Sequence, residues 1–286
     1  MPRAVPGPSA LLDRSYRFVA RYPKPYVEIL DRIHQHLVPR TYVEIGVARG
    51  ATLRLALPGT VAVGIDPRPR LPGPLQGDVR VFPMTSDAFF ATCDLHDVLR
   101  GLPLDLAFVD GMHQFEFALR DFMNLERRSS ADTTILVHDC LPIDEASASR
   151  EHETYTWSGD VWKMVVCLKE WRPDLEVHVV DVAPTGLGVI RGCDARSTVL
   201  SDNYDRIVEQ YMDMPMRALE GRKSEMLNRV PGEWAEVRAL LPDHSFRSMH
   251  IGMVKADRIV SATLSAARRR GARLLRRGGV TAGGGR

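Results

Sequence analysis

The hydrophobic pattern of the chain changes between two periods from one segment to the next. Apolar residues at helical spacing predict helices over 26–37, 51–57, 115–125 and 161–169. Short apolar runs predict strands over 43–45, 61–65, 79–82, 104–109, 133–137, 175–180 and 187–191. The four prolines of 67–74 predict a loop. Strands that alternate with helices predict an α/β fold, Rossmann-like and doubly wound around a largely parallel sheet.

The last two predicted strands differ from the others because no helix separates them. They are joined through Pro184, Thr185 and Gly186. So short a connection implies an antiparallel hairpin at the sheet edge, since parallel strands need a long crossover. Beyond the hairpin, 204–214 and 233–241 predict helices of an extension.

Length and composition suggest one large domain with extensions. The 286 residues are 44% hydrophobic, which is enough for a core. No apolar run approaches the ~20 residues of a membrane-spanning helix, and the first residues lack the apolar segment of a signal peptide, so we expect a cytoplasmic protein. Four cysteines without a C-x-x-C pair indicate neither a zinc site nor a disulfide framework.

The sequence divides into four parts. We expect an N-terminal extension over 1–25, a catalytic domain over 26–195, a helical lid or dimerisation element over 196–255, and a basic, partly disordered tail over 256–286. The net charge is only +2, but arginines gather in the tail. Two interpretations are open: the tail contacts an anionic membrane surface weakly, or it is simply solvated. No nucleic-acid recognition module is present.

The stretch 41–66 reads as strand, glycine turn, helix and strand. Its turn has the spacing Glu44-x-Gly46-x-x-x-Gly50, and the second strand ends at Asp66. A dinucleotide fold requires G-x-G-x-x-G, and a carboxylate before the first glycine would repel a pyrophosphate. A nicotinamide-dependent oxidoreductase is therefore disfavoured. The carboxylate suits a ligand with ammonium and sulfonium charges.

This combination resembles motif I and the following acidic residue of the class I S-adenosylmethionine-dependent methyltransferases. The resemblance covers about 42–191. It implies a seven-stranded sheet closed by the hairpin, a glycine loop against the methionine part of the cofactor, and Asp66 on the ribose hydroxyls. It also implies that Ser86 and Asp87, after the third strand, contact adenine. A helix cap is the alternative for these two residues.

Two neighbouring strands deliver polar residues to one edge of the sheet. The strand 104–109 runs into Asp110-Gly111-Met112-His113, and the strand 133–137 runs into His138-Asp139. Carboxyl ends of parallel strands meet at the edge where doubly wound folds bind ligands. Asp110, His138 and Asp139 are therefore candidate metal ligands, with a turn as the alternative for Asp110.

The arrangement resembles metal-dependent small-molecule O-methyltransferases, including the catechol and antibiotic-sugar types. The resemblance implies that Asp110 and the pair His138-Asp139 hold a metal and that His113 is the general base. Asp110 also belongs to the cofactor set. A histidine at 138 departs from the family's usual carboxylate and leaves the metal open, with Mg²⁺ favoured and Mn²⁺ next. It also allows His138 only to orient Asp139.

A polar segment over 144–158 predicts a functional loop. Tyr155 and Trp157 are candidates to stack on a substrate ring, either a sugar or a phenol. Asp160 and Lys163 either hydrogen-bond the substrate or are structural, with Asp160 as a helix N-cap and Trp162 in the core. The second interpretation is favoured for Asp160 and Trp162.

We therefore expect an O-methyltransferase that uses S-adenosyl-L-methionine and a divalent metal. Its acceptor is a small-molecule hydroxyl, with a saccharide or glycosylated natural product preferred because Asp110-Gly-x-His113 resembles the rhamnosyl and antibiotic-sugar enzymes. A homodimer is expected. The alternatives are a metal-independent methyltransferase of the same fold and a non-catalytic cofactor-binding partner protein.

Overall fold

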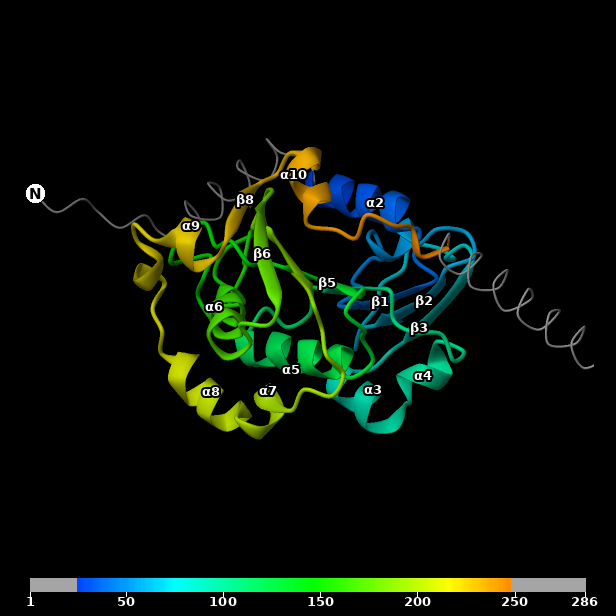
Figure 1. Ribbon diagram of the computed structural model, residues 1–286, viewed down its shortest axis with the longest axis horizontal. Helices are drawn as coiled ribbons and strands as arrows, with labels where there is room; N and C mark the ends of the chain where they lie inside the picture. Colours follow the sequence, from blue (N-terminus) through cyan, green and yellow to red (C-terminus); the bar gives the residue numbers. More distant parts are fainter. Residues whose placement is uncertain (1–24, 248–286) are drawn as a thin grey trace, which may run out of the picture.

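The computed structural model describes residues 25–247. At its centre is one eight-stranded sheet in the order β3-β2-β1-β4-β5-β7-β6-β8 (Figure 1). The strands are β1 (Thr41–Ile45), β2 (Val61–Ile65), β3 (Asp78–Phe82), β4 (Leu106–Val109), β5 (Thr134–His138), β6 (Glu176–Asp181), β7 (Leu187–Arg191) and β8 (Arg229–Pro231). Strand β7 is antiparallel to β5 and β6, and the other neighbours pair in parallel. The expected Rossmann-like fold is confirmed, and the structure adds an eighth strand.

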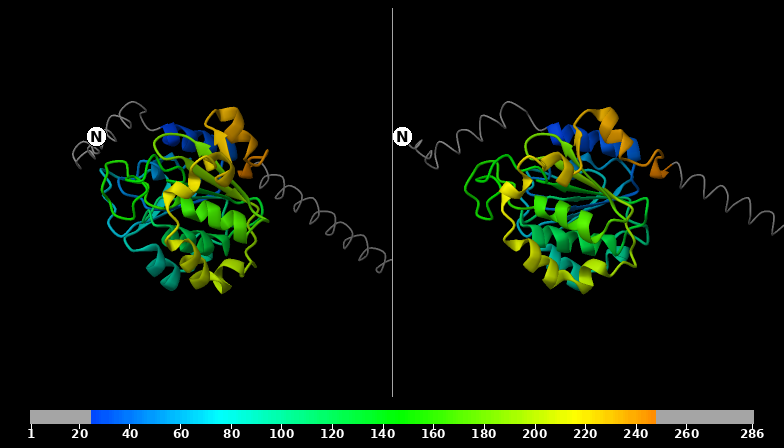
Figure 2. Two further views of the ribbon diagram at one scale, coloured as in Figure 1. Left: turned by 90° about the vertical axis from the view of Figure 1, so that its left-hand side faces the viewer. Right: turned by 60° about the vertical axis from the view of Figure 1, so that its left-hand side comes forward.

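Helices cover both faces of this sheet (Figures 1 and 2). Helix α2 (Pro25–Leu37) and helix α10 (Trp234–Ala239) lie on one face. The opposite face carries α3 (Ser86–Thr92), α4 (Leu95–Val98), α5 (Phe115–Glu126), α6 (Trp162–Trp171) and α8 (Tyr204–Met212). The remaining short elements are η1 (Leu53–Leu55), α7 (Val199–Asp202), η2 (Met216–Leu219) and α9 (Lys223–Met226). Each face thus has its own hydrophobic core.

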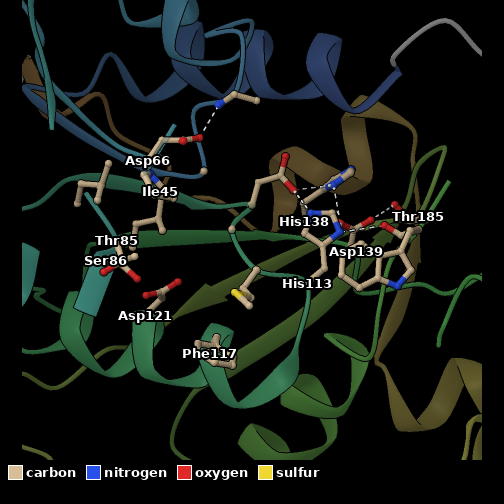
Figure 3. A pocket seen from close by; sticks show the side chains of 18 of the residues that line it. Ile45, Asp66, Thr85, Ser86, His113, Phe117, Asp121, His138, Asp139 and Thr185 are labelled. Atoms are coloured by element: carbon tan, nitrogen blue, oxygen red, sulfur yellow. Dashed lines mark hydrogen bonds and ion pairs between the residues drawn. The ribbon is translucent and has the colours of Figure 1, made fainter. Parts of the chain in front are cut away.

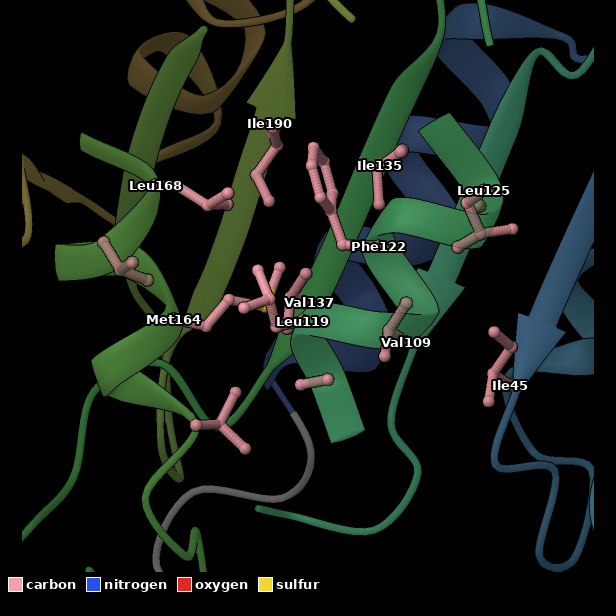
Figure 4. Close-up of a cluster of buried hydrophobic side chains, with 14 of the residues drawn as sticks. Ile45, Val109, Leu119, Phe122, Leu125, Ile135, Val137, Met164, Leu168 and Ile190 are labelled. Atoms are coloured by element: carbon pink, nitrogen blue, oxygen red, sulfur yellow. The ribbon is translucent and has the colours of Figure 1, made fainter. Parts of the chain in front are cut away.

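The larger core lies between the sheet and helices α5 and α6 (Figure 4). Helix α5 buries Leu119, Phe122 and Leu125, whose three-residue and four-residue spacing places them on one face. They pack with residues of the central strands, among them Val137 and Ile190. Removing a fully buried phenylalanine side chain typically costs ~3–5 kcal/mol. This packing fixes α5, which begins next to His113.

The helix expected over 51–57 is largely wrong. Only Leu53–Leu55 forms a single 3₁₀ turn. The segment before Pro58 is too short to repay the cost of helix nucleation. Leu53 is instead buried against Gly64 of β2, where an added Cβ would lie 2.7 Å from the Leu53 Cδ2 atom. Close packing of this turn, rather than helical hydrogen bonding, holds the segment.

The part of the extension that the structure describes packs against the domain. Strand β8 joins the sheet beside β6, and the ring of His36 in α2 lies 6.0 Å from that of Trp234 in α10. Tyr204 at the start of α8 donates to the Glu116 carbonyl at 2.9 Å. The expected helices over 204–214 and 233–241 are confirmed in slightly shorter form. The basic tail over 256–286 lies outside the described residues.

None of the helices within 25–247 combines the length and the apolar character that crossing a bilayer requires.

Candidate functional site

A pocket of about 640 Å³ opens at the carboxyl edge of the parallel strands (Figure 3). The ends of β1, β2 and β5 and the segments that follow β3 and β4 contribute to its lining, as the sequence predicts. The loop 141–160, the β6–β7 turn and Tyr26 complete it. Of the predicted site residues, the pocket brings together Gly46, Asp66, Ser86, Asp87, Asp110, His113, His138, Asp139, Tyr155 and Trp157.

The glycine turn after β1 passes directly against the end of β4. Gly46 has a φ of +91°, and a Cβ there would lie 1.9 Å from the Asp110 carbonyl oxygen. Only glycine fits both restrictions. Asp66 accepts hydrogen bonds from the backbone N–H of Ala48 at 2.8 Å and of Arg68 at 2.6 Å. The turn and the acid are therefore held in fixed positions relative to one another at the pocket.

Glu44 and Gly50 are absent from the pocket lining within the described chain. The Glu44 carboxylate is fully buried and accepts hydrogen bonds from Tyr42 at 2.6 Å and Thr52 at 2.9 Å. Burial raises the pKa of Glu44 to about 8, although these hydrogen bonds oppose the shift. Both residues therefore support the turn from behind in this structure, and neither contacts the pocket that they were expected to line.

Ser86 and Asp87 line the pocket, but neither caps the helix. The N-cap of α3 is Thr85, whose hydroxyl accepts from the Ala88 N–H. Asp87 forms an ion pair with Arg120 at 2.7 Å, and about half of its side chain is exposed. The alternative that one of these two residues caps α3 is therefore wrong by one position.

The acids and imidazoles after β4 and β5 form one cluster (Figure 3). His113 lies 3.3 Å from Asp110 through Nε2 and 3.0 Å from Asp139 through Nδ1. His138 Nδ1 lies 3.2 Å from both carboxylates. His113 and Asp139 have backbone φ angles of +54° and +65°, which residues other than glycine rarely adopt. Such backbone strain is typical of functional sites.

The cluster is electrostatically coupled. Burial opposes ionisation of Asp110, yet His138 and His113 bring the pKa of its carboxyl well below the ordinary value. Burial also lowers the pKa of His113, but Asp139 and Asp110 raise it to about 9. The same carboxylates raise the pKa of His138 well above its usual range against the effect of burial. The carboxylates therefore favour the protonated form of both imidazoles.

The cluster has the donor set of a metal site. One ligand atom each from Asp110, His113 and Asp139 lie within 4.8 Å of one another. The buried Oδ2 atom of Asp139 makes no hydrogen bond within 25–247, although both imidazoles are near it. The Asp139 Oδ1 atom is held by Thr185. Carboxylate oxygens with one imidazole fit a divalent cation. The third member of this group is His113, where the sequence predicts His138.

The loop 141–160 covers His113. Trp157 stacks on the His113 ring with centroids 5.1 Å apart and an interplanar angle of 17°, and the exposed His152 stacks on the other side of the indole at 4.9 Å. The Trp157 carbonyl oxygen lies 2.9 Å from His113 Nδ1. Tyr155 lines the pocket with 60% of its surface exposed. The two predicted aromatic residues are thus at the pocket.

Asp160 is structural in a way that the sequence does not reveal. It caps α5, because its Oδ1 accepts from the Phe115 N–H at 2.9 Å, and it is not the N-cap of α6. Its Oδ2 pairs with Arg150 at 2.8 Å and Lys163 at 3.0 Å. Trp162 is buried in the core, as expected. A substrate contact for Asp160 and Lys163 is therefore not supported.

Several pocket residues have no counterpart among the sequence candidates, and four of them bear on the site. Tyr26 stacks on His138 with ring centroids 4.2 Å apart, and Thr185 holds Asp139. Phe117 and Asp121 face the pocket from α5. The spacing of Phe117 and Asp121 by four residues places them on one helix face, a signal that was available. Nothing in the sequence brings Tyr26 to the end of β5.

Residues 43–140 match the sequence family described as "Methyltransferase domain". The match includes the glycine turn, Asp66, both acids and both histidines of the cluster. The expected enzyme class, an S-adenosylmethionine-dependent methyltransferase, is confirmed for this part of the chain. No curated protein matches the chain.

Several solved structures resemble the chain weakly. Cofactor-bound Rv0187 from MTB is 16% identical with a TM-score of 0.48, over 65% of this chain and 89% of that one. The O-methyltransferase TomG from Streptomyces achromogenes, in complex with SAM, is 15% identical with a TM-score of 0.46, over 64% of this chain and 90% of that one. The SAH-bound methyltransferase PaMTH1 from Podospora anserina is 16% identical with a TM-score of 0.45, over 66% of this chain and 89% of that one. Similarity at this level carries no argument about acceptor or metal.

Proposed function

We propose that this chain, whose residues 43–140 match a methyltransferase domain, transfers a methyl group from S-adenosylmethionine to a hydroxyl of a small molecule. The observation that carries the proposal is the convergence of Asp110, His113 and Asp139 in the same pocket as the glycine turn and Asp66. An activated methyl donor needs an aligned oxygen and a group that takes its proton. The pocket offers both a place for the donor and a base.

His113 is the proton acceptor in this proposal. His113 Nδ1 lies 2.9 Å from the Trp157 carbonyl oxygen, and Nε2 lies 3.3 Å from Asp110. With a proton on Nδ1, Nε2 is the nitrogen that would take the hydroxyl proton, from an acceptor placed beside Asp110. The oxygen bonds to the methyl carbon as the carbon–sulfur bond breaks, S-adenosylhomocysteine leaves, and the proton moves to Nε2. General-base assistance of this kind is typically worth ~10²–10⁴-fold.

Asp110 and Asp139 would hold the divalent cation, with His138 as the third ligand inferred from the sequence. When bound, such a cation lowers the pKa of a hydroxyl that it contacts and supplies positive charge beside the carboxylates. The carboxylates raise the pKa of His113 to about 9. A cation held by Asp110 and Asp139 would oppose this effect and favour the neutral imidazole.

A second arrangement is favoured by one observation. The ligand atoms that lie within 4.8 Å of one another include His113 and not His138. In this arrangement His113 is a ligand whose Nδ1–H is oriented by the Trp157 carbonyl. His138, with Nδ1 3.2 Å from each carboxylate, then orients both acids.

We propose a saccharide or a glycosylated small molecule as the acceptor. The pocket wall near the cluster presents Tyr26, Tyr155 and Trp157, and aromatic side chains provide flat apolar surface on which a sugar ring can pack. A catechol-like acceptor would use the same surface. A panel that contains both classes therefore distinguishes them.

The test is calorimetric titration of metal-stripped protein with S-adenosylhomocysteine, then with Mg²⁺ or Mn²⁺, then with sugars, glycosides and catechols. We expect micromolar binding of the nucleoside and binding of one acceptor class that depends on metal, followed by methyl transfer in the presence of S-adenosylmethionine. Absence of nucleoside binding overturns the proposal. Methyl transfer that resists chelation supports the metal-independent alternative.

Substitution of each histidine separates the two arrangements. If His113 is the base, His113→Asn lowers kcat ~10²–10⁴-fold and keeps metal affinity, while His138→Asn weakens the metal. If His113 is a ligand, His113→Asn weakens metal binding and His138→Asn does not. Calorimetric titration of both variants with Mn²⁺ measures this directly.

A further inference from the structure

Asp121 is a buried acid at the pocket for which the reaction has no use. It lies on the pocket face of α5, only 3% exposed, at the side of the pocket away from the cluster of His113 and Asp139 (Figure 3). Its polar neighbour is the hydroxyl of Ser86, which hydrogen-bonds the carboxyl. A carboxyl group has room for further hydrogen bonds. Within helices, buried acids normally have a cationic or hydrogen-bonding partner.

Other acids near the pocket have such partners. Asp87 pairs with Arg120 at 2.7 Å and is half exposed, and Glu116 of the same helix pairs with Arg150. The guanidinium of Arg120 pairs with Asp87, and its Cζ atom lies 4.4 Å from the centroid of the Phe117 ring. For Asp121, burial raises the carboxyl pKa to about 7, with the Ser86 hydrogen bond opposing. Burial therefore favours the neutral form of this acid.

The position of Asp121 along the pocket determines which part of the methyl donor it can contact. The proposed function brings the sulfonium methyl to the His113 cluster and the ribose to Asp66. In the donor the ribose stands between the sulfonium and the purine, so the purine would lie beyond Asp66, on the side of Thr85, Ser86, Phe117 and Asp121 (Figure 3). A base between β3 and α5 would present its edge to the Asp121 carboxyl.

A carboxylic acid and the six-position edge of adenine are complementary. The carbonyl oxygen of the acid can accept a hydrogen bond from the adenine 6-amino group, and the acid hydroxyl can donate one to adenine N1. Both polar groups of the base would then be hydrogen-bonded in a pocket that excludes water. Asn makes a similar two-point contact with adenine. Leu makes neither.

We propose that Asp121, with Ser86 beside it, recognises the 6-amino edge of the cofactor's purine, in the role that the sequence assigned to Asp87. This inference rests on the proposed function, because it requires the nucleoside to occupy the pocket. Asp121 is then a binding residue that selects adenine. It takes no part in the methyl transfer itself.

The experiment compares S-adenosylhomocysteine with its analogue that lacks the 6-amino group, by calorimetric titration of the full chain. The wild type should prefer the amino form about tenfold or more, the usual effect of leaving a buried polar group unpaired. Asp121→Leu should bind the two nucleosides equally, and Asp121→Asn should keep the preference. Asp121→Ala replaces the Leu variant if thermal unfolding shows that the latter is not folded.

Asp87→Leu is the matched comparison, because it removes an acid from the same side of the pocket. We expect this variant to keep the preference for the amino form. A preference that persists in Asp121→Leu, or that disappears in Asp87→Leu, overturns the inference while leaving the proposed function intact. Failure of the wild type to bind either nucleoside overturns both.

Discussion

The imidazole of His113 stacks on the indole of Trp157 while its Nδ1 lies 2.9 Å from the Trp157 carbonyl oxygen. The side chain of Trp157 lies nearly parallel to the imidazole, and its backbone carbonyl favours a proton on Nδ1. A residue 44 positions away in the chain thus sets the direction in which His113 can accept a proton. The loop 141–160 therefore positions the proposed general base.

The first prediction concerns this stack. Trp157→Leu removes the ring and keeps the backbone carbonyl, so His113 keeps its tautomer and loses its fixed plane. We expect kcat to fall by about tenfold to a hundredfold, because small misplacement of a catalytic group is costly. Trp157→Phe, which can still stack, should retain most of the activity. Steady-state kinetics with saturating cofactor measure the effect, and an unchanged kcat in the Leu variant would contradict it.

The second prediction concerns Gly159. Its φ is +55°, and an added Cβ would lie 1.7 Å from the His113 carbonyl oxygen. Gly159→Ala should therefore move His113 and lower kcat at least about tenfold, together with a loss of stability of about 1–3 kcal/mol. Thermal unfolding and kinetics measure the two effects.

Gly221→Ala is the control for this substitution. Gly221 has a φ of +69°, but nothing lies within 4 Å of an added Cβ. It should show the backbone strain alone, with full activity. Equal kinetic losses in both variants would mean that the contact with His113 is not responsible.

The third prediction concerns the nucleoside. Asp66→Asn keeps the size of the side chain but removes one strong acceptor oxygen from the pocket. We expect the Kd of S-adenosylhomocysteine to rise about tenfold or more, with kcat near the wild-type value once the cofactor is saturating. The His113→Asn variant should show the opposite pattern. A reversed pair of results would exchange the roles assigned to these residues.

The fourth prediction is a pH dependence of stability that comes from His34. Its ring is fully buried beside Tyr42, with centroids 4.6 Å apart, and neither ring nitrogen has a hydrogen-bond partner among the described residues. Burial lowers the pKa of His34 to about 4. The unfolded chain therefore binds this proton near pH 6.5 and the folded chain only near pH 4. Stability from this group is present above about pH 6.5 and is lost as pH falls toward 4.

The loss amounts to about 3 kcal/mol across that window. In His34→Leu the free energy of unfolding should depend less on pH between these limits, because leucine takes no proton and no hydrogen bond is removed. Urea unfolding of both proteins at several pH values isolates the difference, since other groups contribute equally to each. Parallel pH curves would exclude His34 as the source.

The sequence predicts the parts of the site that follow directly from strand ends. Asp66, Asp110, His113, His138 and Asp139 come together because parallel strands end at one edge, a property of topology. Their electrostatic coupling follows from this proximity. Local pattern was therefore sufficient to bring these five candidate residues to one pocket.

The errors of the sequence interpretation come from long-range contacts. Asp160 caps a helix that begins 45 residues earlier, and Tyr26 of α2 stacks on His138 at the end of β5, far along the chain. Glu44 was expected to face the ligand, but Tyr42 and Thr52 occupy its oxygens. No local pattern contains these partners. The domain boundaries, the dimer and the metal stay predictions.

The pairing of β8 with β6 has a consequence for any shortened form of the protein. Val179, Val180 and Asp181 of β6 are aligned in parallel with Arg229, Val230 and Pro231. A fragment that ends at the expected domain boundary near 195 would leave this strand without its neighbour. Unpaired strands at a sheet border invite pairing with other chains and aggregation. The extension therefore acts as a cover for the sheet, and expression trials should keep it.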